Sequence, residues 1–160
     1  MGERTTGPST DQRLLEESLG LLAPVAEELI ATFYDRLFAD YPQLRPMFPE
    51  VLDAQREQLL QAVIALVTQY DHPEELLPRF EALGRRHDRY GARLDHYAAV
   101  GATLLATLRE YAGPAWNAEY EGAWLRAYTF AAGSMMQAGI RAERAMADHI
   151  AAGVLPVRAA

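Results

Sequence analysis

The sequence predicts an all-α protein. Three observations support this: apolar residues recur at helical spacing along nearly the whole chain, no segment alternates as a half-buried strand would, and prolines and glycines separate the apolar segments. The chain has 160 residues, 50% hydrophobic and 23% charged. A chain of this length buries roughly 70% of the surface that its unfolded form exposes, which is enough for one core. We expect a single domain over 11–150, between short tails at 1–10 and 151–160.

The first two helices are predicted over 11–22 and 25–39. The first begins near Ser9, Thr10 and Asp11, whose side chains are favoured at helix N-caps. The second has apolar residues that recur at i, i+4, i+7 and i+8, namely Ile30, Tyr34, Leu37 and Phe38. This spacing indicates a helix with one buried side.

Prolines end the second helix and shape a corner. Pro42 and Pro46 confine 42–48 to a short turn of helix and an irregular connection. After the corner, four more segments show helical periodicity: 52–70, 74–89, 95–112 and 117–148. No heptad pattern persists, so we expect packed helices of unequal length and not a coiled coil.

Charge and composition exclude several classes of function. The formal net charge is −7, which argues against a nucleic-acid surface, because such surfaces are basic. Cysteine is absent, which excludes disulfides, thiolate metal sites and iron–sulfur clusters. No apolar run approaches the roughly 18 residues that span a bilayer, and the first residues lack the apolar stretch of a signal peptide. We therefore expect a cytoplasmic protein that binds neither nucleic acids nor membranes.

The four histidines are the candidate metal ligands. His72 and His149 lie in polar surroundings, and His96 opens a predicted helix, where it could act as a cap. His87 differs, because it lies one helical turn after Leu83 on an apolar stripe. An imidazole at such a position is usually structural. The alternative is an axial metal ligand whose second ring nitrogen donates a hydrogen bond to the Leu83 carbonyl.

Other residues would suit a haem beside His87. A haem needs an axial donor, an apolar slot and a few polar groups on its distal side. Phe48 at the proline corner could pack against the macrocycle, and Gln55 and Leu59 share one helix face. The hydroxyl of Tyr34 lies on an inner helix face, where it needs a polar partner. Taken singly, each of these residues is more often part of an ordinary core or surface.

Several motifs in order make the sequence similar to a known family. The chain resembles the bacterial flavohaemoglobin-like and single-domain haemoglobins over roughly residues 11–140. The segments that show the resemblance are FYDRLFADYPQLRPMF (33–48), AQREQLLQAV (54–63), ALGRRHDRYG (82–91), HYAAVGATLLATLREYAG (96–113) and AWLRAY (123–128). Because the motifs keep their order, the match is more specific than a single histidine.

The resemblance implies the globin fold, with six to eight helices around haem b. His87 stands at the position of the family's proximal iron ligand. Tyr34 and Gln55 stand at the distal hydrogen-bond donors, and Leu59 stands at the distal apolar residue. Phe48 stands at the phenylalanine that packs against the haem.

The proximal side shows one departure from the family. Tyr97 stands where the family has a tyrosine near the proximal imidazole, and a haem would make Arg86 and His96 candidates for its propionates. In flavohaemoglobins a glutamate on the last helix joins the proximal histidine and tyrosine. Gly139 takes that position here, and Glu143 lies one turn beyond it. The reductase half of flavohaemoglobins is also expected to be missing.

These observations leave several functions open. The first is reversible binding of oxygen and of other diatomic gases such as nitric oxide and carbon monoxide. The second is nitric oxide dioxygenation with a separate reductase. The third is gas sensing through haem, although no output domain fits in this length. A haem-free interaction module is the weakest alternative, because such modules lose the ligand histidine. Both a monomer and a homodimer are compatible with the sequence.

Overall fold

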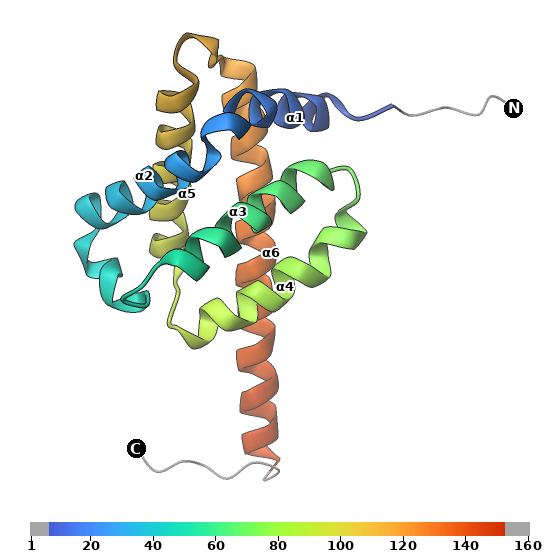
Figure 1. Cartoon of the computed structure of the whole chain (residues 1–160). Helices are drawn as coiled ribbons and strands as arrows, with labels where there is room; N and C mark the ends of the chain where they lie inside the picture. Colours follow the sequence, from blue (N-terminus) through green and yellow to red (C-terminus); the bar gives the residue numbers. More distant parts are fainter. Residues whose placement is uncertain (1–6, 153–160) are drawn as a thin grey trace, which may run out of the picture.

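The computed structural model describes residues 7–152, which are helical over most of their length and contain no strand (Figure 1). The six α-helices are α1 (Thr10–Leu22), α2 (Ala26–Asp40), α3 (Asp53–Thr68), α4 (Pro73–Arg89), α5 (Leu94–Ala112) and α6 (Ala118–Ala151). Three short 3₁₀ helices join them: η1 (Ala23–Val25), η2 (Pro42–Met47) and η3 (Gly113–Ala115). The predicted all-α class is confirmed.

The helix boundaries follow from local chemistry. Ser9 caps α1, because its side chain accepts a hydrogen bond from the backbone of Gln12 at 3.0 Å. Helix α4 begins at Pro73 itself, since proline lacks only a donor that the first turn does not use. Helix α6 continues past the predicted end at 148 to Ala151, because neither glycine nor proline interrupts it there.

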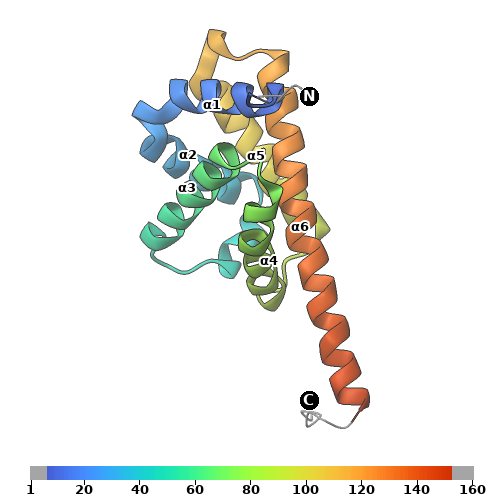
Figure 2. The same cartoon turned by 90° about the vertical axis from the view of Figure 1, so that its right-hand side faces the viewer.

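The longest helix, α6, forms the spine of the fold. Figure 1 shows α4 crossing it obliquely, and Figures 1 and 2 show the C-terminal part of α6 projecting beyond the other helices. At Gly84 the backbones of α4 and α6 nearly touch: a Cβ added there would lie 2.2 Å from the carbonyl oxygen of Met135. Within residues 7–152, no helix has an apolar stretch long enough to cross a bilayer.

The buried indole of Trp124 joins α6 to α1. Trp124 is 1% exposed, and its Nε1 donates a hydrogen bond to the Ser18 hydroxyl at 2.8 Å. That hydroxyl in turn donates to the carbonyl of Leu14 at 2.7 Å. The hydroxyl therefore satisfies an indole nitrogen that would otherwise be buried without a partner.

Replacing Ser18 with alanine should lower the free energy of unfolding by about 1–3 kcal/mol, because the indole nitrogen would remain buried and unpaired. Urea unfolding monitored by circular dichroism measures the change. Ser134→Ala is the matched control, since the Ser134 hydroxyl bonds only the Phe130 carbonyl of its own helix. Equal stability of the two variants would show that the indole contact contributes nothing.

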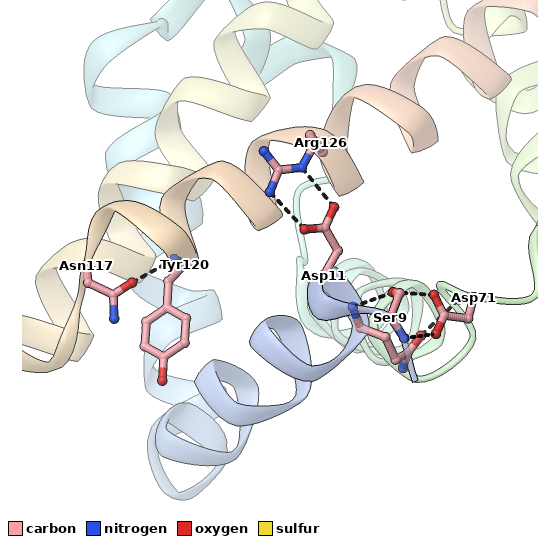
Figure 3. Close-up of polar contacts among 7 residues, drawn as sticks. Ser9, Asp11, Asp71, Asn117, Tyr120 and Arg126 are labelled. Carbon is pink, nitrogen blue, oxygen red and sulfur yellow. Dashed lines mark hydrogen bonds and ion pairs between the residues drawn. The ribbon is translucent and has the colours of Figure 1, made fainter. Parts of the chain in front are cut away.

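Polar contacts fix the first turn of α1 to two distant segments (Figure 3). Asp11 accepts two hydrogen bonds from Arg126 of α6, each 2.8 Å long. The Ser9 backbone nitrogen donates to Asp71, between α3 and α4, at 2.7 Å.

Asn117 caps α6, because its side chain accepts a hydrogen bond from the backbone nitrogen of Tyr120 at 2.8 Å. Residues 1–6 and 153–160, which make up most of the two predicted tails, lie outside the described residues.

Candidate functional site

An aromatic cluster surrounds Tyr34 where α2 approaches the corner after η2. Tyr34 is 2% exposed. Its ring centroid lies 5.0 Å from that of Phe33, 5.9 Å from that of Phe38 and 5.9 Å from that of Phe48. Edge-to-face pairs at such distances are favourable for aromatic rings. The structure thus places the predicted residues Tyr34 and Phe48 in one cluster.

Arg45 holds the backbone that presents Phe48. Its guanidinium donates hydrogen bonds to the carbonyl oxygens of Phe48 at 3.2 Å, Pro49 at 2.9 Å and Glu50 at 3.0 Å. The guanidinium carbon also lies 5.1 Å from the ring centroid of Phe38, within cation–π range. Arg45 was not predicted from the sequence, although an arginine between the two prolines of a corner could have indicated a residue that fixes the corner backbone.

The Tyr34 hydroxyl stays protonated at neutral pH. Burial raises the pKa of Tyr34 to about 12, while hydrogen bonding with the Gln55 side chain and the positive charge of Arg56 oppose that rise. The hydroxyl is therefore available as a donor. The pairing of Tyr34 with Gln55 as distal hydrogen-bond donors stays a prediction.

Helix α3 places Gln55 and Leu59 one turn apart. Both side chains are half-buried, and Leu59 packs against the core. Residues four apart on a helix share a face. A polar donor and an apolar side chain thus stand side by side on the face of α3, as predicted.

Helix α4 orients His87 through its own backbone. The Nδ1 atom of His87 lies 2.8 Å from the carbonyl oxygen of Leu83, as the sequence predicted. Since the carbonyl can only accept, Nδ1 bears the proton and Nε2 keeps its lone pair. Burial lowers the pKa of His87 and outweighs the hydrogen bond to Leu83, and the charge of Arg86 lowers it further. The ring is therefore a neutral imidazole, and the lone pair of its Nε2 is available to a metal ion.

Tyr97 lies against the His87 ring. The two ring centroids are 6.2 Å apart with an angle of 30° between the planes. Helix α5 is held in this position by Tyr128 of α6, whose hydroxyl donates to the carbonyl of Tyr97. The ring of Tyr128 covers Gly101, where an added Cβ would lie 2.5 Å from the ring. The structure therefore brings the two predicted proximal residues together.

A model of a known protein family matches most of this chain. The family model described as Globin matches residues 31–135, a range that includes all of the residues named above from Phe33 to Tyr128. The chain belongs to the globin family.

Two bacterial relatives of this globin differ in how much of their own length it matches. It is 36% identical over 118 residues to a flavohemoprotein of Bordetella parapertussis, a match that covers 72% of this globin but 29% of the relative. It is 31% identical over 124 residues to a globin-like protein of Aquifex aeolicus, covering 78% of this globin and 88% of the relative. This globin thus spans less than a third of the flavohemoprotein's length.

A solved structure shows a close similarity in fold. The globin superposes on an engineered carbene transferase, a candidate nitric oxide dioxygenase of Rhodothermus marinus, with a TM-score of 0.78 and 26% identity. The match covers 89% of this globin and 99% of that chain. The predicted globin fold is confirmed.

Gly139 makes room for an acid on a different helix. A Cβ added at Gly139 would lie 3.1 Å from Cβ and 3.2 Å from Oδ1 of Asp88, so the Asp88 side chain takes the space beside α6. The charge of Asp88 adds to burial in raising the pKa of Tyr97. A hydrogen bond to Asp88, which requires a proton on one of the two acids, and the negative charge of Asp88 both favour protonated Glu143 and raise its pKa. The acid beside Gly139 is therefore Asp88 of α4, which was not predicted from the sequence.

The two residues predicted for propionates have different surroundings. Arg86 is exposed near the end of α4. His96 is half-buried and caps α5, because its Nδ1 accepts a hydrogen bond from the Arg93 backbone at 3.0 Å. The capping role that the sequence allowed for His96 is thus observed, and its Nε2 is not used in that contact.

Proposed function

We propose that this globin binds haem b through Nε2 of His87 and holds oxygen and other diatomic gases beside Tyr34 and Gln55. The observation that supports this best is the hydrogen bond from His87 Nδ1 to the Leu83 carbonyl. It fixes the ring and leaves Nε2 as a neutral donor, which is the state an axial iron ligand needs.

Apolar side chains that the rest of the fold leaves partly uncovered support the haem proposal. Large apolar side chains of α3, α4, α5 and the corner are only half-buried although they pack against the core: Phe48, Leu52, Leu59, Leu83, Tyr97 and Val100. Half-buried apolar surface inside a fold suits a flat apolar macrocycle. We propose that Arg86 and Nε2 of His96 interact with the propionates, since these anions need cationic or donor partners.

The distal residues would hold a polar gas. When bound, the haem supplies the iron at which a diatomic gas binds. The protonated hydroxyl of Tyr34 and the amide of Gln55 are the donors, and burial of Tyr34 strengthens a hydrogen bond by excluding water.

Replacing Tyr34 with phenylalanine should speed oxygen dissociation from the ferrous protein by about ten- to a hundredfold, because a hydrogen bond to a charged ligand contributes roughly 1.5–3 kcal/mol. Stopped-flow displacement of oxygen by carbon monoxide measures the rate. Tyr90→Phe is the control, since Tyr90 is 69% exposed. Unchanged dissociation in Tyr34→Phe would refute the distal role of this hydroxyl.

A similar solved structure favours nitric oxide dioxygenation as a second candidate function. The R. marinus protein is described as a candidate nitric oxide dioxygenase, and it shares this fold at 26% identity. In that reaction a reductase would return the iron to the ferrous state. Sustained consumption of nitric oxide by the oxygenated protein with a reductase present would support this function. A single turnover followed by arrest would favour simple gas binding.

A further inference from the structure

Arg56 follows Gln55 on α3 and has a buried atom without a partner. Among residues 7–152, two buried side-chain nitrogens lack a hydrogen-bond partner, Nε of Arg56 and Nε1 of Trp116. The Arg56 side chain as a whole is 39% exposed, and its outer end has only a long contact, 3.9 Å from Nη1 to the exposed carboxylate of Asp53. Buried donors of this kind are rare and destabilise a fold, so an unsatisfied one calls for a functional explanation.

Arg45 shows what a structural arginine does in this fold. Its guanidinium donates to three backbone carbonyls and fixes the corner. Arg56 makes no comparable contact, since the salt bridge to Asp53 is long and exposed. Among the described residues, no hydrogen bond therefore holds the guanidinium of Arg56, and part of its side chain is exposed to solvent.

The positive charge of Arg56 acts on the hydroxyl of Tyr34. This charge lowers the pKa of Tyr34, as does hydrogen bonding with Gln55, although burial raises that pKa by more. Tyr34 is 2% exposed, so the medium around its hydroxyl screens charge less than water does. A ligand beside that hydroxyl would experience the same positive potential.

We propose that Arg56 is a specificity-determining residue that makes the distal site favour anionic ligands over neutral ones. The inference rests on the haem-binding function proposed above. Positive charge stabilises an anion in a poorly screened site, and the free Nε–H is a donor that such a ligand could use. A neutral ligand is stabilised little by the positive charge or by the Nε–H donor.

The test compares two ligands of the ferric, haem-loaded full chain. In Arg56→Met, azide should bind about tenfold more weakly than in the wild type, because the variant loses a favourable contact between a positive charge and an anion. Imidazole, which binds as a neutral ligand, should keep its affinity within about twofold. Arg56→Lys keeps the charge and should retain most of the azide affinity. Absorbance titration at constant ionic strength gives each dissociation constant.

Arg13→Met is the matched control, because it removes the same charge from an exposed position of α1 and should leave azide binding unchanged. Unchanged azide affinity in Arg56→Met overturns the inference, as does an equal loss of azide and imidazole affinity. Arg56→Lys behaving like Arg56→Met also overturns the role of charge. Failure of the wild-type protein to bind haem would instead refute the proposed function, and a Soret band in the wild type separates the two cases.

Discussion

A His87→Gly variant should lose the proposed axial bond to iron, and its affinity for haem should fall by more than about a hundredfold. Even mutation of a residue that only hydrogen-bonds to a metal ligand typically lowers metal affinity by about 10–100-fold. The reason is that His87 combines a half-buried ring, a proton fixed on Nδ1 by Leu83 and a free Nε2. Absorption spectra in the ferric, ferrous and carbonmonoxy forms report the loss. Added imidazole should restore the histidine-type spectrum, because it can fill the space that glycine leaves.

The fold offers a matched control for this variant. His149 makes the same contact one turn back on its helix, with Nδ1 2.7 Å from the Ala145 carbonyl, but it is exposed. His149→Gly should therefore leave the spectra unchanged. If His87→Gly kept the wild-type spectra while His149→Gly altered them, the proposed iron ligand would be wrong.

Local features of the site were predictable from sequence. The His87–Leu83 contact joins residues one turn apart, so helical periodicity alone places the two groups together. The same holds for Gln55 and Leu59 on α3, and Ser9 shows that capping preferences locate a helix start. Such features depend on a few neighbouring residues and little on the rest of the fold.

Features that depend on how helices cross were not predictable in the same way. The sequence places an uncharged residue at 139, but only the approach of α4 to α6 shows that Asp88 takes the space there. Arg45 and Arg56 are both arginines near the distal side, yet one donates to three carbonyls and the other keeps a buried unpaired nitrogen. Sequence spacing cannot separate these two roles, because side-chain direction and tertiary contacts decide them.

The crossing of α4 and α6 gives the second large prediction. Gly84→Ala should lower the free energy of unfolding by at least about 3 kcal/mol, near the upper end for overpacked cores. An added Cβ would lie 2.2 Å from the Met135 carbonyl oxygen and 2.5 Å from its Cα. These are backbone atoms, which cannot rotate away as a side chain can, so α4 must shift from α6.

That shift should also reach the site, because Leu83 and His87 lie on the same helix as Gly84. We expect Gly84→Ala to weaken haem binding together with stability, measured by urea unfolding and by haem transfer to an acceptor globin. Gly133→Ala on α6 is the control: nothing lies within 4 Å of its added Cβ, so it should stabilise the fold by about 0.5–1 kcal/mol through helix propensity alone. Equal effects of the two substitutions would mean that the helices do not approach as closely as the structure shows. A destabilised Gly84→Ala with unchanged haem affinity would show instead that the position of His87 is independent of this crossing.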